Sequence, residues 1–285
     1  VMVAEHVAGS TKEFAALMNE KARDIGCEHT WFITPNGLDA QETGDGGEVR
    51  LHSTTARDLA AIMSYCAWQS PKSREFLAIT QAQNHYFTDL DGKGNYSCVN
   101  HNALLTMMDG VVSGKTGFTG GAGYCYVGAL EDNGRRYVIA LLGCGWPPHK
   151  TYKWEDTRAL FQYGKDHYQY RNVYRKTRLK PLPVEDGVRN QVAVTLRIQE
   201  EEETLEVLLR EDEQVQVRAE LPRTLCAPVR EGDLVGSIRY VLDGTVLRVY
   251  PVYAGETVQK WDLPYCLCEI LNKFFVEKCK EDENI

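Results

Sequence analysis

Lys115, Thr116 and Gly117 form the tripeptide with the clearest chemical meaning in this sequence, and they follow an apolar pair at 111–112 on an expected strand. A lysine there holds positive charge beside an anion and lowers the cost of forming one. The threonine hydroxyl can donate to a carboxylate, and glycine lets a substrate backbone lie close against the strand. The backbone N–H of Phe118 can supply one oxyanion-hole donor. The triplet therefore predicts the carboxylate-binding wall of an acyl-transfer site.

Serine acyl-transfer sites with a Lys-Thr-Gly strand also need a Ser-x-x-Lys and a Ser-x-Asn element. The eight serines of the sequence meet neither pattern, because none has lysine three residues later and none has asparagine two residues later. Three residues alone also match often by chance, and a surface lysine at the start of a strand is the plainer alternative. The sequence thus contains one wall of such a site without a nucleophile.

Composition and charge are those of a soluble globular protein, with 43% hydrophobic and 25% charged residues in 285. The length leaves room for one large domain or two ordinary ones. A net charge of −8 argues against a nucleic-acid partner. No apolar run approaches the ~20 residues of a membrane span. The chain opens at Val1 without a visible signal peptide, so we expect an N-terminal piece to have been removed or to lie outside it.

Cysteine and histidine usage predicts no metal site and no cofactor. The nine cysteines are scattered without a Cys-x-x-Cys, and the seven histidines form no His-Glu-x-x-His or His-x-x-x-His. Cys125 and Cys144 both fall on expected strands and could be neighbours, although buried free thiols are the preferred interpretation.

The first 174 residues carry helix caps followed by a strongly β-forming region. The expected elements are a helix from Ser10 to Gly26, a polar loop through residue 47, a helix capped by Thr55, a short helix opening at Pro71, a hairpin over 79–99, strands between 111 and 143, and a helix over 154–167.

Beyond residue 174 the composition changes, and a linker-like stretch at 180–184 precedes short strands with turn signals. Strands are expected over 192–198, 204–209, 215–221, 235–242 and 246–252, with a solvated glutamate turn at 200–203 and a hairpin turn at Asp243-Gly244. Residues 263–283 carry an apolar stripe at helical spacing, which indicates either core packing or an interfacial membrane helix.

Five ordered segments resemble a known family, namely residues 7–19, 30–39, 52–60, 100–105 and 109–119. They include Thr-Trp-Phe-Ile-Thr-Pro-Asn-Gly-Leu-Asp at 30–39 and Asp-Gly-Val-Val-Ser-Gly-Lys-Thr-Gly-Phe-Thr at 109–119. In their order and spacing the chain resembles the low-molecular-weight penicillin-binding proteins, the D-alanyl-D-alanine carboxypeptidases of peptidase family S11. The resemblance implies an α+β fold. A β-lactamase/transpeptidase-like domain with an antiparallel sheet and helices, N-terminally incomplete, would cover residues 1–174. A β-rich domain would follow over 175–262, and an amphipathic tail helix over 263–285.

The resemblance also implies roles for individual residues. Lys115, as the catalytic-site lysine, and Thr116 would bind the terminal carboxylate of the substrate. Gly117 and the Phe118 amide would line the site, and Asn36 would lie in a loop facing the cleft. The family has a further basic residue near the last strand of the sheet, for which Lys150 is the best match in this sequence.

The implied function is that of a serine-type carboxypeptidase that removes the terminal D-alanine of peptidoglycan stem peptides and is acylated by β-lactams. Its location would be extracytoplasmic, at the cell envelope, with the tail helix as a contact to the membrane surface. The family's two serine elements lie upstream of the segment that matches Val1, so we expect a missing N-terminal segment or a homodimer partner to cover the exposed helices. A non-catalytic peptidoglycan-binding module of the same fold is the alternative, and a serine β-lactamase is a third possibility.

Overall fold

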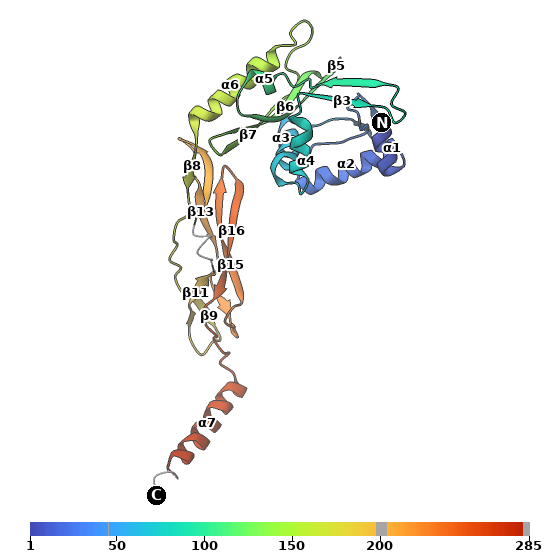
Figure 1. Ribbon diagram of the computed structural model, residues 1–285. Helices are drawn as coiled ribbons and strands as arrows, with labels where there is room; N and C mark the ends of the chain where they lie inside the picture. The colour runs from blue at the N-terminus through green and yellow to red at the C-terminus, as the bar shows by residue number, and fades with distance from the viewer. Residues whose placement is uncertain (45, 198–203, 282–285) are drawn as a thin grey trace. The chain divides into compact units, whose positions relative to one another are not determined.

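The computed structural model describes residues 1–44, 46–197 and 204–281, and Figure 1 shows the course of the chain. The chain divides into two compact units, residues 1–168 and 169–285. This division precedes residue 174 because strand β8 (Tyr168–Asn172) pairs with β12 (Glu206–Arg210). The glutamate turn expected at 200–203 lies outside the described residues.

The helices of the first unit follow the capping signals of the sequence with one exception. They are α1 (Met2–Ala8), α2 (Thr11–Ile25), α3 (Ala56–Ser64) with a π-helical continuation η1 (Tyr65–Gln69), α4 (Ser73–Thr80), α5 (Leu104–Met107) and α6 (Tyr152–His167). Ser10 and Thr55 each accept a hydrogen bond from the backbone N–H three residues later, at 3.1 Å. The short helix predicted to open at Pro71 forms as α4, but it begins at Ser73, because a turn closed by the Ser73 N–H on the Ser70 carbonyl comes first.

An antiparallel sheet of order β5-β6-β7 is the centre of the first unit. Its strands are β5 (Val111–Thr119), β6 (Gly123–Asp132) and β7 (Arg135–Leu141). On one face Val127 and Ala129 belong to an apolar cluster with Met63 of α3, and on the other face Leu130 packs with Phe161 of α6. Strand β6 is paired on both sides, whereas β5 lies at an edge of this sheet.

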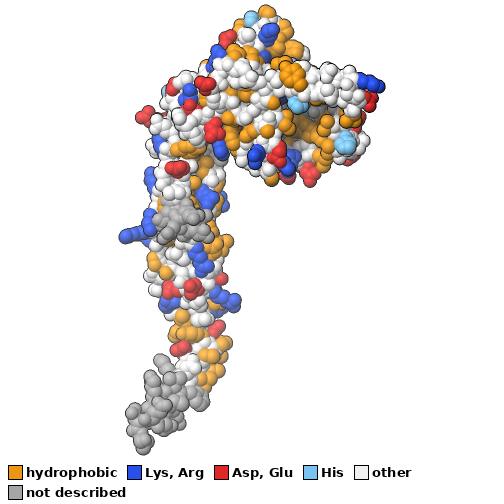
Figure 2. Space-filling model, viewed as in Figure 1, with side chains coloured by type: hydrophobic (Ala, Val, Ile, Leu, Met, Phe, Trp, Pro, Cys, Tyr) orange, Lys and Arg blue, Asp and Glu red, His pale blue; other side chains and the backbone are white. Residues whose placement is uncertain are grey.

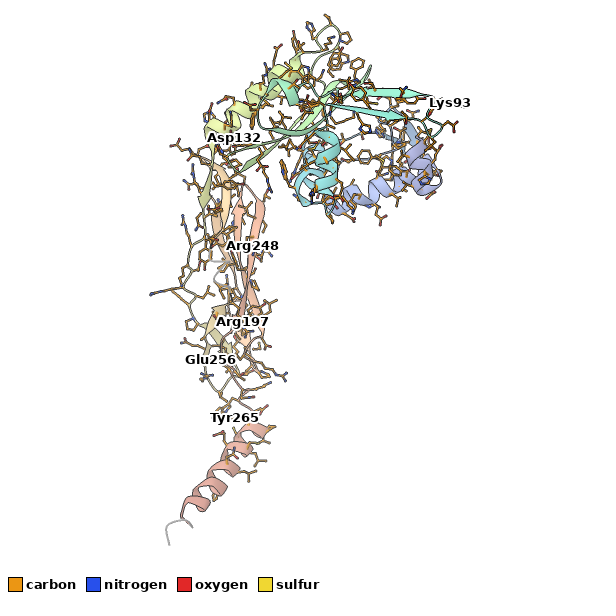
Figure 3. The ribbon with its side chains drawn as sticks, viewed as in Figure 1. Lys93, Asp132, Arg197, Arg248, Glu256 and Tyr265 are labelled. Atoms are coloured by element: carbon orange, nitrogen blue, oxygen red, sulfur yellow. The ribbon has the colours of Figure 1, made fainter. Side chains whose placement is uncertain are left out.

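Two hairpins accompany the sheet. The hairpin of β3 (Asn84–Thr88) and β4 (Asn95–Val99) confirms the prediction for 79–99, and Lys93 lies at its tip (Figure 3). The loop expected through residue 47 contains a short second hairpin, β1 (Gln41–Thr43) with β2 (Val49–Leu51). Gly47, at φ 84°, adopts the left-handed conformation that lets the chain turn there.

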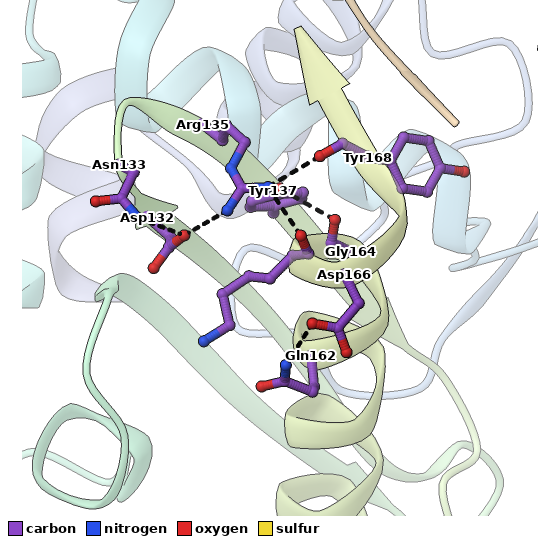
Figure 4. Close-up of polar contacts among 9 residues, drawn as sticks. Asp132, Asn133, Arg135, Tyr137, Gln162, Gly164, Asp166 and Tyr168 are labelled. Carbon is purple, nitrogen blue, oxygen red and sulfur yellow. Dashed lines mark hydrogen bonds and ion pairs between the residues drawn. The ribbon is translucent and has the colours of Figure 1, made fainter. Parts of the chain in front are cut away.

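Polar contacts tie the turn between β6 and β7 to the C-terminal end of α6 (Figure 4). Arg135 pairs with Asp132 at 2.7 Å and donates hydrogen bonds to the carbonyls of Lys165 and Tyr168 at 2.8 and 2.9 Å. These side chains are only 18% and 26% exposed, so the pair is partly shielded from solvent. The contacts hold the C-terminal end of α6 against the sheet.

Apolar surface is exposed on the helices near the N-terminus, as the sequence predicts. Met2, Val3 and Val7 are 81%, 75% and 60% exposed. A groove of about 320 Å³ is lined by Phe14, Leu17, Met18, Lys21, Ala22, Ile25, Phe32 and Ile62. Figure 2 shows apolar side chains, in orange, among the charged groups on the surface of this unit.

The second unit is a β-rich domain with its own core. A four-stranded sheet has the order β11-β16-β15-β13 and a three-stranded sheet the order β10-β9-β14. Their strands are β9 (Leu182–Glu185), β10 (Gln191–Val192), β11 (Val194–Leu196), β13 (Gln216–Glu220), β14 (Leu225–Cys226), β15 (Leu234–Leu242) and β16 (Thr245–Ala254). Val192, Ile238 and Val252 are buried at its centre. The hairpin turn predicted at Asp243-Gly244 is confirmed, with φ of 46° and 83°.

The tail forms helix α7 (Leu263–Glu281). Leu263, Leu267, Ile270 and Phe274 are 82%, 55%, 53% and 71% exposed, and their spacing puts them on one side of the helix. Within the described part of the chain, no helix combines the length and the apolar character that crossing a membrane requires.

Candidate functional site

The Lys-Thr-Gly triplet lies on β5 beside a cavity of about 1060 Å³. Sequence-distant elements close around it: the α2 face, the 32–38 loop, the segment before α5, strand β5 and the start of α6. Its lining is Met18, Phe32, Thr34, Pro35, Asn36, Gly37, Leu38, His52, His101, Ala103, Lys115, Thr116, Gly117, Phe118, Tyr124, Lys150, Thr151, Lys153 and Trp154. The structure therefore brings together all six residues singled out from the sequence. Their roles stay predictions.

Strand pairing sets the directions of the triplet. Lys115 lies opposite Val127, on the sheet face that packs against α3, and Thr116 lies opposite Tyr126. The Lys115 ammonium is on an exposed residue and donates a hydrogen bond to the Thr116 carbonyl. Because β5 is an edge strand of its sheet, a peptide can lie along its outer side.

The loop that carries Asn36 is held by two side chains from outside it and by Asn36 itself. Asn19 of α2 exchanges two hydrogen bonds with the Phe32 backbone, at 2.7 and 2.8 Å. His52 Nδ1 accepts from the backbone N–H of Ile33 at 2.9 Å and of Thr34 at 3.3 Å. Asn36 Oδ1 accepts from the Leu38 N–H at 3.1 Å, so its amide oxygen shapes the loop.

The neutral form of His52 is the one this loop requires, because a protonated imidazole has no acceptor nitrogen. Burial lowers the pKa of His52, and the Asp39 carboxylate opposes that shift. As the pH falls below about 6.5, the unfolded chain takes up this proton before the folded chain does. The free energy of unfolding should therefore fall with pH in that window and level off below the folded-state pKa.

Urea titrations between pH 7.5 and 4.5 test this expectation. His52→Asn is the matched variant, since its amide oxygen can still accept the two N–H groups but does not titrate. The difference between wild type and variant should be flat above pH 6.5 and change only below it. A variant with the same pH slope as wild type would contradict the assignment.

Lys153 is a site residue that the sequence reasoning missed. It is 7% exposed, its ammonium lies 4.6 Å from the ring centre of Tyr124 and 4.7 Å from that of Trp154, and it donates to the Lys150 carbonyl at 2.6 Å. Burial lowers the pKa of Lys153, and so does the charge of Lys150, whereas the electrostatic interaction with Cys144 raises it. Lys150, by contrast, is exposed. The available signal was a lysine beside a tryptophan at the start of the helix that follows the last strand.

Asn102 and Tyr126 support β5 from beneath. Both are buried, and the Tyr126 hydroxyl donates to Asn102 Oδ1 at 3.0 Å. Burial raises the pKa of Tyr126 despite this hydrogen bond. A Cβ on Gly114 would lie 2.4 Å from the tyrosine oxygen and 2.6 Å from Asn102 Nδ2. The strand can therefore lie this close to the pair only because residue 114 is glycine. Asn102 falls within the segment 100–105 that resembles the family, but nothing in the sequence indicated its position beneath the strand.

Ser113 and Cys144, a serine and a cysteine near the cavity, are both constrained by hydrogen bonds. Ser113, two residues before Lys115, is fully buried and donates to Thr80 at 2.9 Å. No serine is among the described lining residues. Burial and the hydrogen bond to Asp156 raise the pKa of Cys144 to about 11, which keeps its thiol protonated at neutral pH. Cys125 and Cys144 are both free thiols, but both are half-buried rather than buried as the sequence suggested.

Comparison with known proteins identifies the family. The model of the D-alanyl-D-alanine carboxypeptidase family, peptidase S11, matches residues 1–145, and that of the C-terminal domain of penicillin-binding protein 5 matches residues 168–260. D-alanyl-D-alanine carboxypeptidase DacF of Bacillus subtilis is 25% identical over 264 residues, which cover 91% of this chain and 62% of that protein. DacB2 of Mycobacterium tuberculosis is 35% identical over 160 residues, or 56% of this chain and 50% of that protein. The chain thus spans between half and about two thirds of the length of these relatives.

The fold agrees with this match. The crystal structure of penicillin-binding protein 5 from Haemophilus influenzae superimposes with a TM-score of 0.59 at 24% identity, over 90% of this chain and 69% of that one. Both parts of the fold expected from sequence, the α+β transpeptidase-like domain and the all-β domain, are therefore confirmed. The chain belongs to the D-alanyl-D-alanine carboxypeptidase family, peptidase S11.

Proposed function

We propose that this chain forms the substrate-binding wall of a serine-type D-alanyl-D-alanine carboxypeptidase that acts on peptidoglycan stem peptides. One observation carries the proposal: Lys115, Thr116 and the buried Lys153 line the same cavity. Lys115 and Thr116 lie on β5, an edge strand with which a peptide can pair. These are the groups needed to hold a peptide by its terminal carboxylate.

In the proposed complex, the substrate backbone lies along β5 over Gly117, where no side chain obstructs it. Thr116 and Lys115 donate to the terminal carboxylate, and Lys153 approaches it from the start of α6. The Phe118 N–H then lies near the carbonyl under attack and stabilises the oxyanion. Asn36 shapes the facing loop.

The attacking serine and its general-base lysine are supplied, in this proposal, by residues outside these 285, because no Ser-x-x-Lys or Ser-x-Asn occurs among them. The serine oxygen attacks the carbonyl between the two D-alanines, and the terminal D-alanine leaves with the proton. Water then hydrolyses the acyl-serine. β-Lactams would acylate the same serine.

A labelling experiment tests this division of roles. The 285-residue chain should not be labelled covalently by a fluorescent penicillin, since none of its serines fits the Ser-x-x-Lys pattern. It should still bind an acetylated peptide ending in D-Ala-D-Ala more tightly than the same peptide with a C-terminal amide. Covalent labelling would show that the chain does contain a nucleophile. Equal binding of the acid and the amide would contradict the proposed carboxylate-binding site.

The complete protein separates the remaining alternatives. Release of D-alanine from a stem pentapeptide supports the carboxypeptidase, and binding without release supports a peptidoglycan-binding module. Rapid nitrocefin turnover would instead indicate a β-lactamase. We further propose an extracytoplasmic, cell-envelope location, with the apolar side of α7 as a contact for a membrane surface. An N-terminal segment or a second copy would cover the apolar groove of α2.

A further inference from the structure

The charge of the cavity is one-sided. Three lysines, Lys115, Lys150 and Lys153, line it, and the described lining contains no aspartate or glutamate. This excess of positive charge stands out in a chain whose net charge is −8. Low-dielectric walls with charges of one sign concentrate the field and select ligands of the opposite sign.

Two of the lysines repel each other at the start of α6. Lys150 and Lys153 are close enough for the charge of one to lower the pKa of the other. Among the described residues, no carboxylate forms an ion pair with either ammonium. Thr151, the residue before the helix, makes no side-chain capping hydrogen bond. Repulsion between the ammoniums and the uncapped helix start are both relieved by an anion bound there.

A single terminal carboxylate does not use all of this charge. In the proposed function, Lys115, Thr116 and the buried Lys153 hold that carboxylate, and the exposed Lys150 at the rim is left over. The Lys153 ammonium donates a hydrogen bond to the Lys150 carbonyl, which links the two residues. The Lys153 side chain is buried, whereas that of Lys150 is exposed.

We infer that Lys150 selects substrates that carry a second carboxylate, on a side chain of the residues preceding the two D-alanines. The inference rests on the proposed function and refines its substrate class. The site should therefore bind a stem peptide with a free side-chain carboxylate before the two D-alanines more tightly than one with the corresponding amide.

Two peptides differing by one charge test this, acetyl-L-Glu-D-Ala-D-Ala and acetyl-L-Gln-D-Ala-D-Ala. Calorimetric titration of the full chain at low salt should give a Kd roughly two- to fivefold lower for the Glu peptide. The preference should vanish in Lys150→Gln and reverse in Lys150→Glu. It should also shrink in about 1 M salt, where the Debye length falls to about 3 Å.

Lys93→Glu is the matched control, because Lys93 is exposed at the tip of the β3–β4 hairpin and is not a lining residue (Figure 3). It changes the net charge equally and should keep the wild-type preference. Equal affinity of wild type for both peptides overturns the inference, as does a preference that survives Lys150→Gln. Failure of both peptides to bind is a different result and counts against the proposed function itself.

Discussion

Replacing Lys153 by methionine should weaken binding of a D-Ala-D-Ala peptide by roughly 10- to 150-fold, which is the about 1.5 to 3 kcal/mol of a hydrogen bond to a charged group. The methionine keeps an unbranched chain of similar length but removes the ammonium that lies over the rings of Tyr124 and Trp154. Binding of the C-terminal amide should change little, because that ligand has no carboxylate to lose. Calorimetric titration of the acid and the amide measures both effects.

Lys165→Met is the control for this experiment. Lys165 lies on the same helix, and its ammonium is over the ring of Phe161, away from the cavity lining. It should bind both peptides as wild type does. A Lys153→Met chain with wild-type affinity and an unchanged urea midpoint would show that Lys153 only packs between the aromatic rings.

Gly114→Ala should both destabilise the first unit and reduce peptide binding. The new Cβ meets Tyr126 and Asn102 at 2.4 and 2.6 Å, and both side chains are buried and bonded to each other. Relief requires β5 to move, which costs about 1 to 3 kcal/mol as in other overpacked cores. Because Lys115 is the next residue, the displacement also moves the groups that we propose bind the carboxylate.

The matched substitution is Gly120→Ala, just beyond the same strand, where nothing lies within 4 Å of the added Cβ. We expect its free energy of unfolding to stay within about 0.5 kcal/mol of wild type. Urea unfolding followed by tryptophan fluorescence compares the two variants. Equal stability of Gly114→Ala and Gly120→Ala would refute tight packing beneath β5.

Short-range signals predicted the elements well, since the cause and the effect lie within a few residues. Ser10 and Thr55 cap helices because their hydroxyls reach an N–H three residues later, and Asp243-Gly244 turns because both residues adopt positive φ. Pro71, by contrast, predicted a start for α4 that lies before its first residue, Ser73. Its neighbours Ser70 and Ser73 close a turn first, and that competition cannot be weighed from a proline alone.

The sequence did not distinguish Lys153 from Lys150 as the further basic residue of the site. Lys150 and Lys153 are three residues apart and chemically identical, so spacing from the last strand could not separate them. The fold buries Lys153 between Tyr124 and Trp154, whereas Lys150 stays at the surface. Burial depends on the distance between β6 and α6 in space, which no local pattern encodes.

By itself, the sequence determined the family, the order of the elements and the Lys-Thr-Gly wall, because these depend on residue types at close spacing. Only the tertiary structure decided which residues share the cavity with that wall. It brought Asn36, Lys115 and Lys153 together across more than a hundred residues of chain, made β5 an edge strand and placed Gly114 on the Asn102–Tyr126 pair. Those relations arise from packing of the sheet between two helical layers, where side chains far apart in sequence compete for the same space.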